Sequence, residues 1–211
     1  MIVVSACWGA FAVTWAVGGV LEKLRAPRVL RRKLDYGTLI GFAAAIPIIS
    51  TPKTAWTWLT FGPAWVRGVG VALVVVGTAG TLWARLSLGL MWSSRVVVRQ
   101  EHALRTTGPY GITRHPIYTG LLTMFAGTAL ALGFGRWTLL FGVLAVGLSV
   151  KARIEERLLS NAFPSQYAEY RRRVPALIPR PRLRVRERAA QRGGRAQGRG
   201  GRHELQHREA E

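Results

Sequence analysis

The chain has 211 residues and a formal net charge of +20 at pH 7, and 49% of its residues are hydrophobic. The apolar residues form long runs, while the arginines lie between the runs and at the C-terminal end, a pattern typical of a small integral membrane protein with a basic cytoplasmic side. The single cysteine, Cys7, excludes a disulfide within the chain and a cysteine-based metal site, and we expect no other metal site.

The first three apolar runs predict three membrane helices, over Ile2–Leu21, Tyr36–Ser50 and Val66–Trp83. The pair Gly18-Gly19 is expected to break the first helix near its end. Lysines and arginines follow the first run directly, so the positive-inside rule places that loop in the cytoplasm and the N-terminus outside.

Two further spans are predicted over Ile117–Leu132 and Thr138–Val150, joined by a tight turn at Gly133–Trp137. Both are shorter than a usual crossing, so we expect a helical hairpin whose second helix continues into the cytoplasm through Ser160. The predicted fold is therefore an all-α integral membrane protein with about five transmembrane helices and a cytoplasmic C-terminus.

The composition changes at Arg180, after which arginine, glycine and glutamine dominate. This change predicts a membrane domain over residues 1–179 and a disordered basic tail over residues 180–211. We expect anionic lipid headgroups to attract the tail. Arginine- and glycine-rich tails also bind RNA, but no aromatic residues are interleaved here, so no specific nucleic acid partner is expected.

The stretch from Leu104 to Gly120 combines turn residues with titratable ones at the start of an apolar run. Gly108-Pro109 predicts a turn, and Pro116 is suited to the first turn of a helix. Arg114, His115 and Tyr118 therefore crowd at the mouth of a membrane helix, where polar groups are costly unless they serve a function. For these three residues alone, a positively charged flank with an interfacial tyrosine is the simpler interpretation.

The longer pattern resembles the isoprenylcysteine carboxyl methyltransferase family and its bacterial and phospholipid-methylating relatives. The matching stretches, in order and spacing, are Thr106–Tyr110, Arg114–Gly120, Glu155-Glu156, Phe163, Tyr167–Tyr170 and Arg173–Pro175. They lie within residues 100–179, about the last half of the predicted membrane domain. The resemblance implies methyl transfer from S-adenosylmethionine to a small apolar or lipid-like acceptor, at a cofactor site on the cytoplasmic side. Carboxylate O-methylation of a prenylcysteine-like acceptor is favoured.

The resemblance also implies cofactor contacts, carried over residue by residue to the positions that match. These positions are His102, Leu104, Gly108, Tyr110, His115, Pro116, Ile117, Tyr118 and Glu155. Glu155 supplies an anion for the cofactor's ammonium group. The start of the fourth span supplies donors for its carboxylate, because a helix N-terminus attracts anions.

The residues leave the acceptor group open. An ionised carboxylate acceptor needs a cation to orient it, for which Lys151 and Arg153 are candidates, with Lys151 at the place where the resemblance implies a basic substrate contact. An amine acceptor, as in a phospholipid headgroup, needs deprotonation, for which Glu156 and His115 are the candidate bases. Lys151 and Glu155 share one helix face, which by itself is also the pattern of an ordinary surface ion pair.

One departure from the family concerns Pro164, which stands where the family has glycine and could alter the turn that folds a C-terminal arm over the cofactor. Two other interpretations remain. One is a reductase of the sterol-reductase kind with a nicotinamide cofactor, whose phosphates would need more arginine, asparagine and tryptophan than this turn offers. The other is a non-catalytic membrane scaffold, in which Glu155, His115 and Tyr118 could be replaced without consequence.

Overall fold

A computed structural model describes residues 1–25, 45–52, 55–57, 62–88 and 104–179. Within these ranges every regular element is a helix, which confirms the predicted all-α class. Residues 1–179 form one compact unit. The predicted disordered tail, most of the predicted second span and His102 lie outside the described residues; of that span, residues 45–50 are described and are helical.

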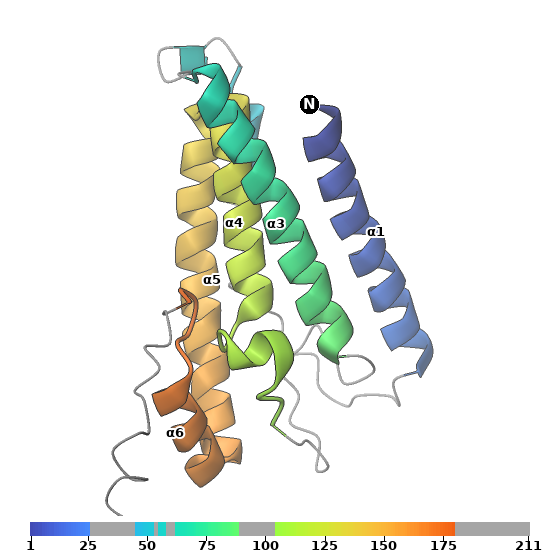
Figure 1. Ribbon diagram of the computed structural model, residues 1–211, viewed down its shortest axis with the longest axis vertical. Coiled ribbons are helices and arrows are strands. Elements are labelled where there is room, and N and C mark those ends of the chain that lie inside the picture. The colour runs from blue at the N-terminus through green and yellow to red at the C-terminus, as the bar shows by residue number, and fades with distance from the viewer. Residues whose placement is uncertain (26–44, 53–54, 58–61, 89–103, 180–211) are drawn as a thin grey trace, which may run out of the picture. The chain divides into compact units, whose positions relative to one another are not determined.

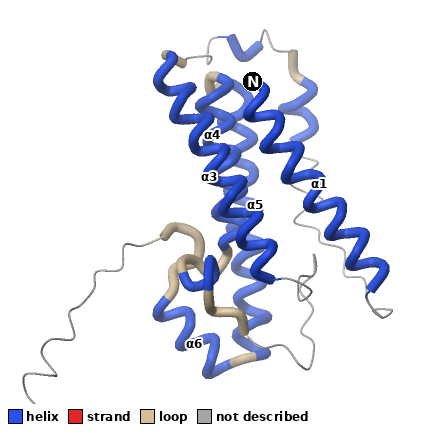
Figure 2. Tube along the Cα trace, turned by 45° about the vertical axis from the view of Figure 1, so that its right-hand side comes forward, coloured by secondary structure: helices blue, strands red, loops and turns tan. Residues whose placement is uncertain are grey.

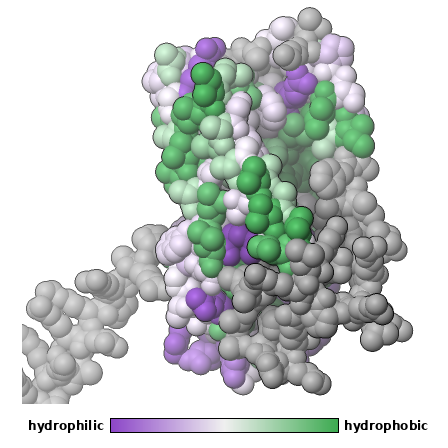
Figure 3. Space-filling model, turned by 90° about the vertical axis from the view of Figure 1, so that its right-hand side faces the viewer, coloured by the Kyte–Doolittle hydropathy of each residue, from purple (hydrophilic) through white to green (hydrophobic). Residues whose placement is uncertain are grey.

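Three of the described helices are long and apolar enough to cross a membrane. They are α1 (Ile2–Arg25), α3 (Ala64–Leu88) and α5 (Gly135–Ala162), and the apolar helix α4 (Pro116–Leu132) is shorter, with 17 residues (Figure 1). In Figure 3, apolar side chains cover most of the middle of the described surface, and polar ones lie toward its lower end and at its top. The chain is thus an integral membrane protein, whereas five crossings and the direction of the termini stay predictions.

Helix α1 continues through Gly18-Gly19, so the predicted break there is wrong. In lipid an interrupted helix would leave backbone N–H and C=O groups without partners, which favours a continuous helix despite two glycines. Gly18 instead provides close approach, because a Cβ atom at this position would collide with the guanidinium of Arg85 on α3. At the other end of α1, Trp8 Nε1 donates to Thr128 Oγ1 of α4 at 3.1 Å.

Glycines bring α3 and α4 into direct backbone contact. A Cβ on Gly77 would lie 2.8 Å from the carbonyl oxygen of Gly120, and a Cβ on Gly127 would lie 2.6 Å from that of Gly70. Gly70 and Gly77 of α3 therefore serve helix packing, since small residues let membrane helices approach closely. Gly68 and Gly80 have open space beside them instead.

Helices α4 and α5 form the predicted hairpin, although the turn is shorter than expected. Gly133 ends α4 with a φ of 85°, and α5 begins at Gly135 rather than after Trp137. Glycine readily adopts a left-handed backbone conformation, and here this conformation reverses the chain within two residues. The residues that follow can therefore be helical. Helix α5 then runs without a break past Ser160, as predicted.

After α5 the chain folds back as the short helix α6 (Pro164–Arg173), which lies beside the C-terminal part of α5 (Figures 1 and 2). Pro164 occupies the first helical position, where its missing N–H is not needed, so the residue opens α6. Tyr167, Tyr170 and Val174 form a buried cluster against which Leu104, Leu159 and Phe163 pack. This cluster directs the chain after α6 back toward the start of α4.

Candidate functional site

A turn and a helix start bring the polar residues of the fourth span to one place. The turn is the 3-10 helix η3 (Gly108–Gly111), which Gly108 enters with a φ of 64° and in which Pro109 is buried. The backbone N–H groups of Ile112 and Thr113 donate to the carbonyl of Pro109. This closed turn ends just before His115, the N-cap residue of α4.

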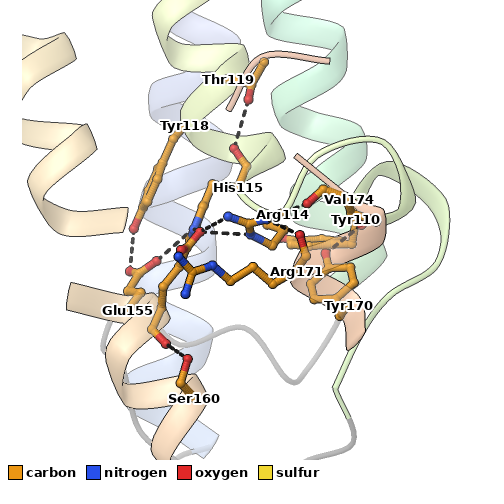
Figure 4. A network of polar contacts seen from close by, with 11 residues as sticks. Tyr110, Arg114, His115, Tyr118, Thr119, Glu155, Ser160, Tyr170, Arg171 and Val174 are labelled. Atoms are coloured by element: carbon orange, nitrogen blue, oxygen red, sulfur yellow. Dashed lines mark hydrogen bonds and ion pairs between the residues drawn. The ribbon is translucent and has the colours of Figure 1, made fainter. Parts of the chain in front are cut away.

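Two adjacent carboxylates of α5 face these residues (Figure 4). Tyr118 donates its hydroxyl to Glu155 Oε1 at 2.5 Å, and His115 Nδ1 lies 3.5 Å from Glu155 Oε2. The other ring nitrogen of His115, Nε2, lies 3.3 Å from Glu156 Oε1. The rings of His115 and Tyr118 are stacked, with centroids 5.4 Å apart. His115 therefore sits between the two carboxylates.

Arg114 binds the second carboxylate with a charge-assisted pair of hydrogen bonds. Its Nε and Nη2 donate to Glu156 Oε1 at 2.9 and 2.7 Å. The side chains of Arg114 and Glu156 keep only 9% and 14% of their surface exposed, so this ion pair is largely shielded from water. Shielded, multiply bonded pairs of this kind are stronger than ordinary surface salt bridges.

The segment after α6, residues 174–177, lies along the start of α4. The backbone N–H of Arg114 donates to Pro175 O at 2.8 Å, and that of His115 donates to Ala176 O at 3.0 Å. Thr119 Oγ1 donates to Leu177 O at 2.6 Å. We call residues 174–177 the C-terminal arm; its carbonyl groups hold it against the residues that face the carboxylates.

Three tyrosines stay protonated beside this arm. Burial raises the pKa of Tyr167 to about 12, and the charge of Glu156 adds to the shift. Burial also raises the pKa of Tyr110 and of Tyr170. The protonated hydroxyl of Tyr170 donates to Tyr110 O at 2.6 Å, which ties α6 to η3.

The structure brings together most of the predicted cofactor residues. His115, Pro116, Ile117 and Tyr118 belong to the start of α4, and the last of these contacts Glu155. Gly108 and Tyr110 lie in η3, where Tyr110 O accepts the hydroxyl of Tyr170. Leu104 packs in the cluster of α6 instead.

The two candidate cations of α5 differ in their surroundings. Lys151 is half-buried, and it precedes Glu155 by one helical turn on the same face. Arg153 is exposed and lies two positions before Glu155, about 200° around the helix. Helix geometry therefore places Lys151, and not Arg153, on the face of Glu155.

Two features of the site were not predicted as site residues from sequence. The sequence around Arg114 by itself predicts a basic flank, whereas in the structure Arg114 pairs with Glu156, 42 residues away along the chain. The carbonyl groups of the C-terminal arm belong to the backbone, so no residue type in the sequence indicates their role. The only available sequence signal was that Arg114 directly precedes His115 at the mouth of an apolar run, where a charge is costly.

Residues 65–166 match the family model described as "Phospholipid methyltransferase". A cobalt-zinc-cadmium resistance protein of Cupriavidus metallidurans is 37% identical over 83 residues, which are 39% of this chain and 38% of that protein. The protein-S-isoprenylcysteine O-methyltransferase of Schizosaccharomyces pombe is 40% identical over 81 residues, 38% of this chain and 34% of that protein.

The fold is similar to the solved structure of a eukaryotic intramembrane Ras methyltransferase, an isoprenylcysteine carboxyl methyltransferase. The TM-score is 0.53 at 19% sequence identity, over 70% of this chain and 54% of that one. The chain aligns with between a third and two fifths of the length of the two relatives named above. Over residues 65–166, the chain is thus similar in sequence to the phospholipid methyltransferase family.

Proposed function

We propose that this chain transfers a methyl group from S-adenosylmethionine to the carboxylate of a lipid-like acceptor, at the end of its membrane helices. The observation that carries the proposal is Glu155, a carboxylate ordered by Tyr118 and His115 at the mouth of an apolar helix. The phospholipid methyltransferase family model, which spans Glu155, and the similarity to a methyltransferase relative support it.

The residues at this place fit the amino-acid head of the cofactor. The side chain of Glu155 keeps 20% of its surface exposed, so it can still receive an ammonium group. Ile117 and Tyr118 belong to the first turn of α4, whose N–H groups attract a carboxylate. When bound, the cofactor supplies an electrophilic methyl group on its sulfonium; the chain's part is to align the acceptor with that methyl group and to exclude water.

The contacts of the candidate bases favour a carboxylate acceptor over an amine. Both ring nitrogens of His115 face carboxylates, and Glu156 Oε1 already takes two hydrogen bonds from Arg114. A general base needs a lone pair directed at the proton that it removes. An ionised carboxylate has no such proton and needs only a cation to orient it, which Lys151 supplies in this proposal.

Calorimetric binding of S-adenosylmethionine to the detergent-purified chain tests the cofactor. We expect saturable binding that Glu155→Ala abolishes, whereas Glu169→Ala, which removes an exposed carboxylate paired with Arg173, leaves it unchanged. Binding of a reduced nicotinamide cofactor in place of S-adenosylmethionine would support a reductase instead. Binding of neither by the folded chain would contradict the proposal and favour a scaffold.

Product chemistry tests the acceptor. In proteoliposomes with a prenylcysteine analogue and labelled cofactor, we expect a methyl ester, which base releases as methanol. Lys151→Gln should reduce ester formation at least about tenfold without weakening cofactor binding, because its charge orients the acceptor. Arg153→Gln should have little effect. Base-stable label in phosphatidylethanolamine would show N-methylation and contradict the carboxylate assignment.

A further inference from the structure

Arg114 joins the C-terminal arm to the pair of carboxylates (Figure 4). Two of its hydrogen bonds go to Glu156, and its Nη1 donates to Val174 O at 2.5 Å and to the backbone carbonyl of Arg171 at 3.1 Å. These bonds use four of the five N–H donors of a guanidinium. A side chain so fully engaged with the protein acts on a ligand through its neighbours.

A short chain of contacts leads from Arg114 to Glu155, the side chain proposed to bind the cofactor's ammonium group. Arg114 holds Glu156 Oε1, which lies 3.3 Å from His115 Nε2. His115 Nδ1 in turn lies 3.5 Å from Glu155 Oε2. If the guanidinium moves, Glu156 loses its hydrogen bonds to Arg114. The positions of His115 and then of Glu155, which are in contact with Glu156 and with each other, change as a result.

The same guanidinium donates one of its four hydrogen bonds to the arm, at Val174 O, and another to α6, at Arg171 O. The arm is also held by the backbone N–H groups of Arg114 and His115, which donate to Pro175 and Ala176. If the arm leaves, the shielded side chain of Arg114 loses the acceptor Val174 O, and two backbone N–H groups lose theirs. Buried donors without partners are costly, so the arm and the ion pair stabilise each other.

We propose that Arg114 is a positioning residue that couples docking of the C-terminal arm to the order of Glu155 and His115. This inference rests on the proposed function, in which Glu155 contacts the cofactor. Coupling between two sites is reciprocal. Binding of S-adenosylmethionine therefore tightens the arm, and a loosened arm weakens binding of the cofactor.

A lysine cannot replace Arg114 in this role. Its ammonium is a single point with three donors, and it has no planar fork that reaches Glu156 on one side and two carbonyls on the other. Arg114→Lys keeps the charge and removes the link. Arg173→Lys is the matched control, because the exposed side chain of Arg173 pairs with Glu169 one turn earlier on α6.

Hydrogen exchange of the backbone N–H groups of Arg114 and His115, read in a peptide over residues 112–118, reports docking of the arm directly. In Arg114→Lys we expect faster exchange at these two groups and a loss of affinity for S-adenosylmethionine on the order of tenfold. Arg173→Lys should change neither. In the unaltered chain, saturating S-adenosylmethionine should slow exchange at the same two groups, and in Arg114→Lys this slowing should be lost.

Thr119→Val gives a second, independent perturbation, because it removes the hydrogen bond to Leu177 O without touching either carboxylate. We expect faster exchange at the two groups together with weaker cofactor binding. Exchange that Arg114→Lys leaves unchanged would overturn the role of Arg114 in holding the arm. Faster exchange with full cofactor affinity, in either variant, would overturn the coupling alone. A chain that binds no S-adenosylmethionine would refute the proposed function as well.

Discussion

Glu155 and Glu156 are neighbours in sequence and point about 100° apart on α5, which gives them different partners. Glu155 takes the hydroxyl of Tyr118, and Glu156 takes the guanidinium of Arg114. His115 lies within reach of both. The two carboxylates thus have different roles: Glu155 keeps some exposed surface for a ligand, and Glu156 anchors the surrounding chain.

Tyr118→Phe tests whether the hydroxyl of Tyr118 orders Glu155 for the ligand. The variant removes the hydroxyl bonded to Glu155 and retains the ring stacked on His115. A hydrogen bond to a charged group contributes about 1.5–3 kcal/mol. If it orders Glu155 for the cofactor, its loss should weaken S-adenosylmethionine binding by roughly tenfold to a hundredfold in calorimetry.

The matched control is Thr123→Val, which removes a hydroxyl from the same helix. Thr123 Oγ1 donates to Thr119 O within α4 and contacts neither carboxylate. We expect its cofactor affinity to equal that of the unaltered chain. An equal loss in both variants would mean that Tyr118 acts through the stability of α4 rather than through Glu155.

At the scale of elements, the glycine contacts of α3 and α4 hold the helix that carries His115 and Tyr118. Gly77→Ala would place a methyl group 2.8 Å from two backbone atoms, Gly120 O and Met124 N, which cannot move without shifting α4. Such overpacking typically costs about 1–3 kcal/mol. We expect a lower midpoint of thermal unfolding in detergent.

Gly80→Ala is the control for the same chemical change on the same helix, because nothing lies within 4 Å of the added methyl group. There, alanine should leave the midpoint unchanged or raise it, since glycine inside a helix is destabilising by roughly 0.5–1 kcal/mol relative to alanine. Equal effects at Gly77 and Gly80 would argue against close packing of α3 on α4.

At the scale of the whole molecule, the helices of this chain require a lipid environment. Val17, Val76 and Val146, on α1, α3 and α5, keep 52%, 64% and 67% of their surface exposed in the isolated chain. Helix α5 is the element that joins this apolar part to the polar site, because it continues from the hairpin to Glu155 and α6. The site thus lies where a lipid-borne acceptor can present a charged end.

Removing residues 180–211 tests whether the basic tail takes part in the chemistry. Every hydrogen bond described at the site joins residues between Pro109 and Leu177, so we expect the shortened chain to bind S-adenosylmethionine within about twofold of the full chain. The tail holds ten arginines and four glutamates. Activity in anionic vesicles should become less sensitive to salt when the tail is removed, because its attraction to headgroups is screened by ions.

Retained salt sensitivity in the shortened chain would place the attraction in the basic residues of the membrane domain. A loss of cofactor binding would contradict the view that residues 1–179 contain the whole site.

Much of the helical architecture was determined by the sequence alone, because the signals are local. A long apolar run must be helical in lipid, since every backbone N–H and C=O group needs a partner within the segment. Pro116 opens α4 and Gly133 ends it for equally local reasons of backbone geometry. The grouping of His115, Tyr118 and Glu155 also came from the sequence, but only through the family pattern.

Only the tertiary structure decided which of these residues meet. Gly18 looked like a break and is a contact with Arg85, and two glycines of α3 pack while two face open space. Arg114 looked like a flanking charge, yet its acceptors Glu156, Arg171 and Val174 lie 42, 57 and 60 residues further along the chain. Periodicity and turn chemistry report on neighbours in sequence, whereas hydrogen bonds across such distances exist only after α5 and α6 have folded back onto the start of α4.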